Sequence, residues 1–105
     1  MPILICYCTC PDAASAARIA EALVDERLAA CVNVLPQATS FYRWEGRDEQ
    51  ATEFPVLIKT TSERYAALEQ AIRKNHPYDL PEIISWPVAS GLPAYLDWVE
   101  REVGA

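Results

Sequence analysis

The fold is decided by residues 39–59, TSFYRWEGRDEQATEFPVLIK. Aromatic and polar residues alternate over 39–44, and a β-branched, apolar run follows over 53–59. The polar segment between them, 45–49, contains a glycine and is typical of a β-hairpin turn. We therefore expect two antiparallel strands that are joined by a turn and not by a helix.

Upstream of this hairpin, residues 31–35 are β-branched and apolar, and Pro36 interrupts them before the aromatic segment begins. We expect one long strand that is bent or bulged near Pro36. The hairpin carries Phe41, Tyr42 and Trp44, which is more apolar area than a core of this size readily covers. This excess suggests a partner subunit.

The other expected elements flank the hairpin on both sides. Residues 3–8 form a nearly continuous apolar run, which is typical of a central strand. The spacing predicts a helix over 13–27 with Asp12 as its N-cap, and a second helix up to residue 74 that is capped by the hydroxyls of residues 60–62. A strand over 82–88 and a last helix opened by Pro93 complete the chain.

The expected order is β-α-β-β-α-β with a terminal helix. It indicates an α+β fold, a ferredoxin-like sandwich with a long β-hairpin and a C-terminal helix, as a single domain over residues 1–105. A doubly wound parallel sheet is disfavoured, because its consecutive strands need helical crossovers and the middle two strands here are joined by a turn.

Composition limits the classes of function. The chain has 105 residues, of which 51% are hydrophobic and 23% charged, and its formal net charge is -6. Without a basic cluster, nucleic acid is not an expected partner. The apolar runs are far shorter than the ~20 residues of a membrane helix, so we expect no membrane partner. A start without a secretory pattern predicts a cytoplasmic protein.

Residues 75–82, NHPYDLPE, are a stiff loop with the only histidine of the chain, His76. Each proline fixes its own φ and favours an extended residue before it. Loops held by a rigid scaffold often carry binding groups, so this segment is a candidate functional site. The alternative is a tight turn whose aromatic residue packs on the core.

Cys6, Cys8 and Cys10 alternate along the first expected strand and should share one of its faces. They fit no structural zinc pattern, and in a cytosolic chain we expect reduced thiols. Cu(I) accepts a thiolate and an imidazole, which makes Cys8 and His76 candidate ligands for a copper ion if the fold brings them together. The alternative is that these cysteines are small core residues. A catalytic cysteine is disfavoured in a central strand, so no enzyme activity is expected.

Several motifs together resemble the CutA divalent-cation tolerance family over nearly the whole chain. They are CTCPD at 8–12, RLAACVN at 27–33, YRWEG at 42–46, IKTT at 58–61, HPY at 76–78, PEII at 81–84 and YLDW at 95–98. The resemblance implies a metal-tolerance protein with ferredoxin-like subunits in a homotrimer, in which long hairpins pair between subunits as part of a PII-like architecture.

The resemblance also implies site residues. Copper contacts in bacterial members are attributed to the motif cysteine and two adjacent histidines, and these positions are Cys8, Asn75 and His76 here. The first histidine is thus missing, and whether Cys6 or Cys10 replaces it stays open. The PII-like architecture implies an alternative function, a trimeric signalling or scaffold protein that binds a small molecule or protein at inter-subunit clefts. The pocket residues would be Lys59, Tyr78, Glu82 and Trp44.

Overall fold

The computed structural model describes residues 2–104. Its elements along the chain are β1 (Ile3–Cys10), α1 (Ala13–Asp25), β2 (Cys31–Val34), β3 (Ala38–Trp44), β4 (Arg47–Thr61), α2 (Tyr65–Asn75), β5 (Ile83–Pro87) and α3 (Pro93–Val103). The order agrees with the one expected from the sequence, except that the single long strand expected around Pro36 is divided into β2 and β3.

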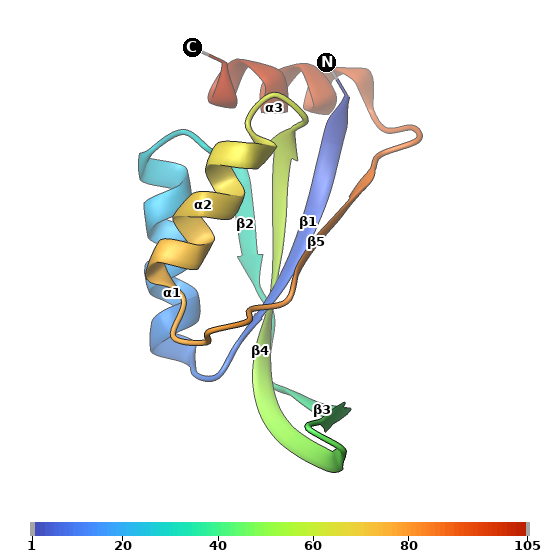
Figure 1. The fold of residues 1–105 in the computed structure, drawn as a ribbon. Coiled ribbons are helices and arrows are strands. Elements are labelled where there is room, and N and C mark those ends of the chain that lie inside the picture. Colours follow the sequence, from blue (N-terminus) through green and yellow to red (C-terminus); the bar gives the residue numbers. More distant parts are fainter. Residues whose placement is uncertain (1, 105) are drawn as a thin grey trace.

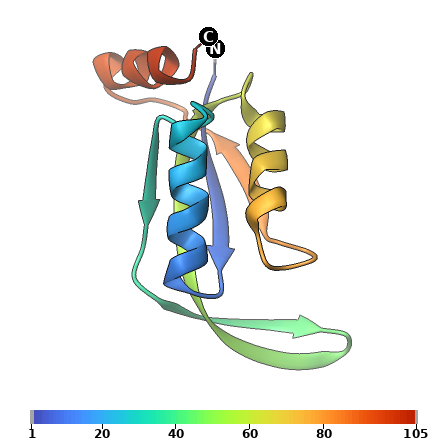
Figure 2. The same cartoon turned by 90° about the vertical axis from the view of Figure 1, so that its left-hand side faces the viewer.

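The strands β2, β4, β1 and β5 lie side by side in that order, and every neighbouring pair is antiparallel. α1 and α2 cover one face of this sheet, and α3 lies across its end (Figures 1 and 2). This arrangement is the ferredoxin-like fold. The predicted fold class and the central position of the first strand are therefore confirmed.

Successive side chains of β1 point alternately to the two faces of the sheet, one covered by helices and one open. Cys6, Cys8 and Cys10 point toward the helices and pack in one core cluster with Ile19 of α1 and Leu68 of α2. All three cysteines are fully buried. Side chains between them in the sequence belong to the opposite face, which neither α1 nor α2 covers.

The hairpin extends beyond the body of the subunit (Figures 1 and 2). β4 pairs first with β3 and then with β2, so the strand expected to bend near Pro36 is two strands on one partner. Val34 pairs with Val56, and Ala38 pairs with Glu53. The chain thus advances four residues from β2 to β3 while β4 advances three. The extra residue is a β-bulge, which bends the hairpin away from the sheet.

The hairpin turn is tighter than the five residues expected. Trp44 pairs with Arg47, and Glu45 and Gly46 alone connect the strands. Both have positive φ values, 51° and 79°. A two-residue turn with positive φ at both positions has the twist that antiparallel strands require.

The N-cap of α1 is the one predicted from the sequence, whereas the N-cap of α2 is not. Asp12 caps α1, and its carboxylate accepts from the Ser15 amide at 2.7 Å. The predicted hydroxyl cap of α2 is wrong, because Thr60 and Thr61 continue β4, where Thr61 pairs with Ile3. The buried Thr60 hydroxyl donates instead to the carbonyl of Leu28 at 2.7 Å.

Within residues 2–104, no helix has both the length and the apolar composition to cross a membrane.

The substitution Thr60→Val should destabilise the protein by about 1–3 kcal/mol, because it leaves the buried Leu28 carbonyl without its donor. The matched control is Thr52→Val, the same change at an exposed position of the same strand. Chemical denaturation followed by circular dichroism measures both. Equal unfolding midpoints for the two variants would contradict this role of Thr60.

Candidate functional site

The last residues of β1 and the first residue after α2 form the candidate metal site. Cys8 and Cys10 share the helix-facing side of β1, two positions apart. His76 is the C-cap of α2, where its extended backbone (ψ 137°) ends the helix before Pro77. The antiparallel sheet and the crossover of α2 bring this histidine back to the end of β1.

The Sγ atoms of Cys8 and Cys10 and a ring nitrogen of His76 all lie within 4.8 Å of one another. The two cysteines are fully buried and His76 is 8% exposed. The structure thus brings the expected pair Cys8 and His76 together and adds Cys10. Cys6 faces the same way but lies deeper in the core, outside this group.

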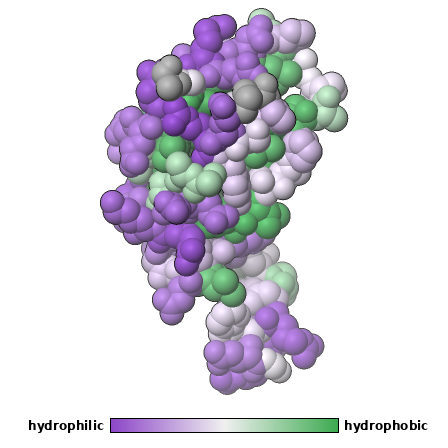
Figure 3. All heavy atoms as spheres, turned by 45° about the horizontal axis from the view of Figure 1, so that its top comes forward, coloured by the Kyte–Doolittle hydropathy of each residue, from purple (hydrophilic) through white to green (hydrophobic). Residues whose placement is uncertain are grey.

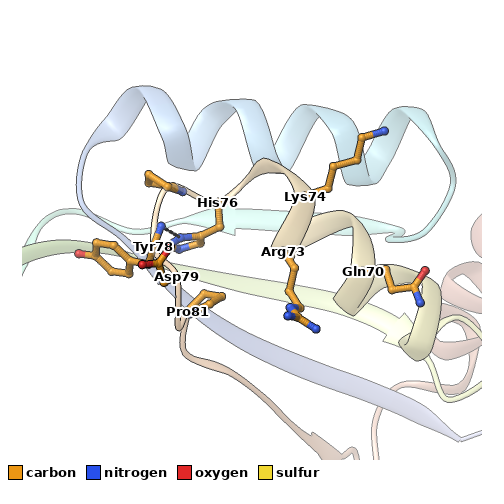
Figure 4. A pocket seen from close by; sticks show the side chains of 8 residues that line it. Gln70, Arg73, Lys74, His76, Tyr78, Asp79 and Pro81 are labelled. Carbon is orange, nitrogen blue, oxygen red and sulfur yellow. Dashed lines mark hydrogen bonds between the residues drawn. The ribbon is translucent and has the colours of Figure 1, made fainter.

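Both ring nitrogens of His76 already have backbone partners. The Tyr78 amide donates to Nδ1 at 3.0 Å, drawn as the dashed line in Figure 4. An amide can only donate, so Nδ1 is the unprotonated nitrogen and Nε2 carries the proton. Nε2 then donates to the Thr9 carbonyl at 2.7 Å. These bonds fix the neutral tautomer and tie the loop to β1.

The thiols of β1 have different acidities. Burial raises the pKa of Cys6 to about 12. The Sγ of Cys8 donates to the Thr9 carbonyl at 3.8 Å. Interaction with the neighbouring thiol of Cys10, together with burial, raises the pKa of Cys8. The interaction with Cys8, helped by Ser15 at the start of α1, lowers the pKa of Cys10. Of these two neighbouring thiols, Cys10 is therefore the one that ionises more readily.

Asn75, which stands where a second histidine was expected, belongs to the end of α2. Its Nδ2 donates to the Ala71 carbonyl at 2.8 Å, and its own carbonyl accepts from Arg18 at 3.3 Å. The side chain therefore satisfies a carbonyl of the last helical turn.

A second feature, which we call the hairpin cavity, lies between the hairpin and the loop after α2. Its volume is about 740 Å³. Its walls include Phe41, Tyr42 and Trp44 of β3, Glu53 of β4, and Tyr78, Asp79 and Glu82 of the loop. Of the pocket residues expected from the sequence, Trp44, Tyr78 and Glu82 thus come together.

Lys59, the fourth expected pocket residue, does not line the hairpin cavity. It lies six residues along β4 from Glu53, and its Nζ donates to the Asn33 side chain. Alternation along β4 places it on the same face of the strand as Glu53, but nearer the opposite end.

Glu53 is a polar residue of the cavity that was not among the pocket residues expected from the sequence. It is only 8% exposed and accepts a hydrogen bond from the Tyr78 hydroxyl at 2.9 Å. Burial, followed by this bond, raises the pKa of Tyr78 to about 12. Glu82 anchors the other side through Thr9, whose hydroxyl is 3.5 Å from its carboxylate. The sequence offered one indication of this role, which is that Glu53 directly precedes an apolar segment of the strand.

A shallower cavity of about 540 Å³ lies on the other side of the loop (Figure 4). Arg73 and Lys74 of α2 border it together with His76, Tyr78 and Asp79. The two basic residues end α2, where cations complement the helix dipole. We assign no ligand to this cavity.

Proteins of known name resemble this chain over most of its length. The "Divalent-cation tolerance protein CutA" of Thermus thermophilus is 45% identical over 96 residues, which is 91% of this chain and 93% of that protein. The "Protein CutA homolog" of Xenopus laevis is 50% identical over 93 residues, 89% of this chain. The chain spans 62% of the length of the Xenopus protein and 54% of the mouse "Protein CutA".

Solved structures give the same result. The crystal structure of CutA from Xylella fastidiosa superposes with a TM-score of 0.94 at 46% identity, covering 96% of this chain and 97% of that one. The Cut A1 divalent cation tolerance protein of Thermus thermophilus gives 0.95 at 42% identity, covering 97% and 99%. The family model described as "CutA1 divalent ion tolerance protein" matches residues 4–102. The chain therefore belongs to the CutA1 divalent ion tolerance protein family.

Proposed function

We propose that the chain acts in divalent-cation tolerance by binding a copper-like metal ion as a homotrimer, with Cys8, Cys10 and His76 as the ligands. The proposal rests on one observation, the convergence of two thiols and an imidazole within 4.8 Å in a buried position. Two sulfurs and one nitrogen suit soft Cu(I). No catalytic step is part of this function.

The donor set favours Cu(I) over zinc. A structural zinc ion takes four ligands in a tetrahedron, and the residues described here supply three in this group. Cu(I) accepts lower coordination and prefers thiolates. Cys10 then takes the place of the missing second histidine, because its Sγ lies in the same group as the Sγ of Cys8 and a ring nitrogen of His76.

His76 must give up its present hydrogen bonds to bind metal through Nε2. The proton would move to Nδ1, which could no longer accept from the Tyr78 amide, and the contact with the Thr9 carbonyl would also be lost. The two thiols are therefore the primary ligands, and His76 joins them by rearranging the turn that contains it. Both lost bonds oppose binding.

Cys8→Ser and Cys10→Ser should each lower the Cu(I) affinity of the reduced protein by more than about tenfold. Loss of a residue that only supports a ligand already costs roughly that much, and these residues are the ligands themselves. His76→Ala should weaken it less than either, because imidazole binding first breaks two hydrogen bonds. Titration against a Cu(I)-binding chromophore measures all three. Cys31→Ser, on β2 and outside the cluster, is the control. Unchanged affinity in all three variants would refute the site.

Copper affinity should also fall as the pH is lowered. The ligating forms are the thiolates and the neutral imidazole, so metal binding releases protons. Protons compete with the metal ion for these ligands as the pH falls, so we expect weaker binding at the lower pH. Competition titrations at about pH 7.5 and about pH 5.5, corrected for the chromophore alone, measure this. An affinity independent of pH would argue against these ligands.

A homotrimer would cover apolar surface that one subunit leaves open. Ile84 and Trp86 of β5 are 51% and 43% exposed, and they pair with Tyr7 and Ile5 on the open face of the sheet. In Figure 3 hydrophilic residues gather on the helical side at the left, and more of the apolar residues lie toward the right. Together with the aromatic hairpin, this surface supports assembly through the open face.

Light scattering at micromolar concentration should give a mass of about 35 kDa, three times the 11.7 kDa of one chain. Trp86→Glu should shift the protein toward the monomer, because it places a charge on the open face. Val24→Glu is the matched control, since Val24 is similarly exposed, at 45%, but lies on α1. A wild-type protein with the mass of one chain would refute the trimer.

The hairpin cavity favours a second candidate function, a PII-like signalling or scaffold trimer that binds a small molecule. It brings Trp44, Tyr78 and Glu82 together in a volume typical of small-molecule sites. Cytoplasmic location remains part of both proposals, because the cytoplasm keeps thiols reduced.

A further inference from the structure

The hairpin cavity has a strongly one-sided charge. Three carboxylates, those of Glu53, Asp79 and Glu82, contribute to its walls, and no lysine, arginine or histidine is among the described residues that line it. Glu53 is 8% exposed, and its carboxylate receives a hydrogen bond from the neutral Tyr78 hydroxyl. A carboxylate so far removed from water is stabilised by a positive partner, which the cavity walls do not supply.

These carboxylates do not form a metal site. Within residues 2–104, the only group of three or more His, Cys, Asp and Glu side chains that converges closely enough for one ion is that of Cys8, Cys10 and His76. The three acidic groups of the hairpin cavity therefore do not converge on a single ion. They suit a larger cation that contacts them separately.

The wall formed by β3 is aromatic. Phe41, Tyr42 and Trp44 are 73%, 46% and 48% exposed in one subunit and line the same cavity. The face of an aromatic ring attracts a cation, and it also packs against an apolar body. Carboxylates from β4 and the loop, together with aromatic rings from β3, match an ammonium group that is carried on an apolar or aromatic frame.

We infer that the hairpin cavity binds an organic ammonium ion, with Glu53 and Glu82 facing its charge and Trp44 packing against its frame. This inference rests on the second proposed function and names the class of ligand for it. The same ammonium chemistry has two sources, a free small amine or a basic side chain of another subunit in the trimer. The cavity volume of about 740 Å³ accommodates either.

The test uses benzylamine, with benzyl alcohol and benzoate as neutral and anionic probes of the same ring. Isothermal titration calorimetry on the metal-free wild-type protein should show saturable binding of benzylamine alone. Glu53→Gln, which keeps an acceptor for Tyr78, should weaken it by about tenfold or more, and Trp44→Leu should weaken it as well. Glu82→Gln, an exposed position, serves as a second variant should Glu53→Gln fold poorly.

Glu49→Gln is the matched control, because it removes the same charge from β4 outside the cavity. Its benzylamine affinity should stay within about twofold of the wild type, because Glu49 is exposed and solvent screens its charge. Equal binding of benzyl alcohol or benzoate would overturn the cationic ligand while leaving a small-molecule function intact. Equal weakening by Glu49→Gln and Glu53→Gln would also overturn it.

If a neighbouring subunit supplies the cation, benzylamine will not bind the wild type. Glu53→Gln and Glu82→Gln should then raise the concentration at which the trimer dissociates, whereas Glu49→Gln should not. That result supports the ammonium site with the basic side chain as its occupant. Absence of both benzylamine binding and any effect on assembly would refute the inference.

Discussion

Antiparallel pairing between β1 and β4 is the interaction on which the rest of the structure depends. It runs from Ile3 opposite Thr61 to Cys10 opposite Phe54, along the whole of β1. On its other edge, β4 pairs first with β3 and then with β2. The strand therefore links the hairpin to the body of the subunit. The register of this pair therefore decides which side chains face the helices and which face outward.

The two candidate sites use opposite faces of this strand pair. Cys8 and Cys10 point to the helical side, where they meet His76. Thr9, between them, lines the hairpin cavity on the other side with Glu53. A shift by one residue in the register would exchange the two sets, so the candidate metal ligands and the carboxylates of the cavity depend on the same pairing.

The loop after α2 connects the two sites physically. His76 donates to the carbonyl of Thr9, and two residues later the Tyr78 hydroxyl donates to Glu53. The two rings lie 4.9 Å apart between centroids, and Pro77 between them limits the backbone. A rearrangement of His76 that lets it bind metal would also release the Tyr78 amide, which gives the metal site a direct contact with the wall of the cavity.

The sequence by itself determined the fold class, because the apolar periodicity and the turn at Gly46 leave few ways to cover the sheet. It also determined the family, and it identified Cys8 and His76 as a pair. It misplaced the N-cap of α2. The preference of hydroxyl side chains for helix N-caps is local, whereas the pairing of Thr61 with Ile3 joins residues far apart in the chain. Only the tertiary structure decided that Cys10, and not Cys6, lies with Cys8 and His76 in the candidate metal site, and that Glu53 rather than Lys59 lines the cavity. The physical reason is that alternation assigns a residue to a face of a strand, whereas the pairing register and the path of the loop decide which residues from other elements meet it there.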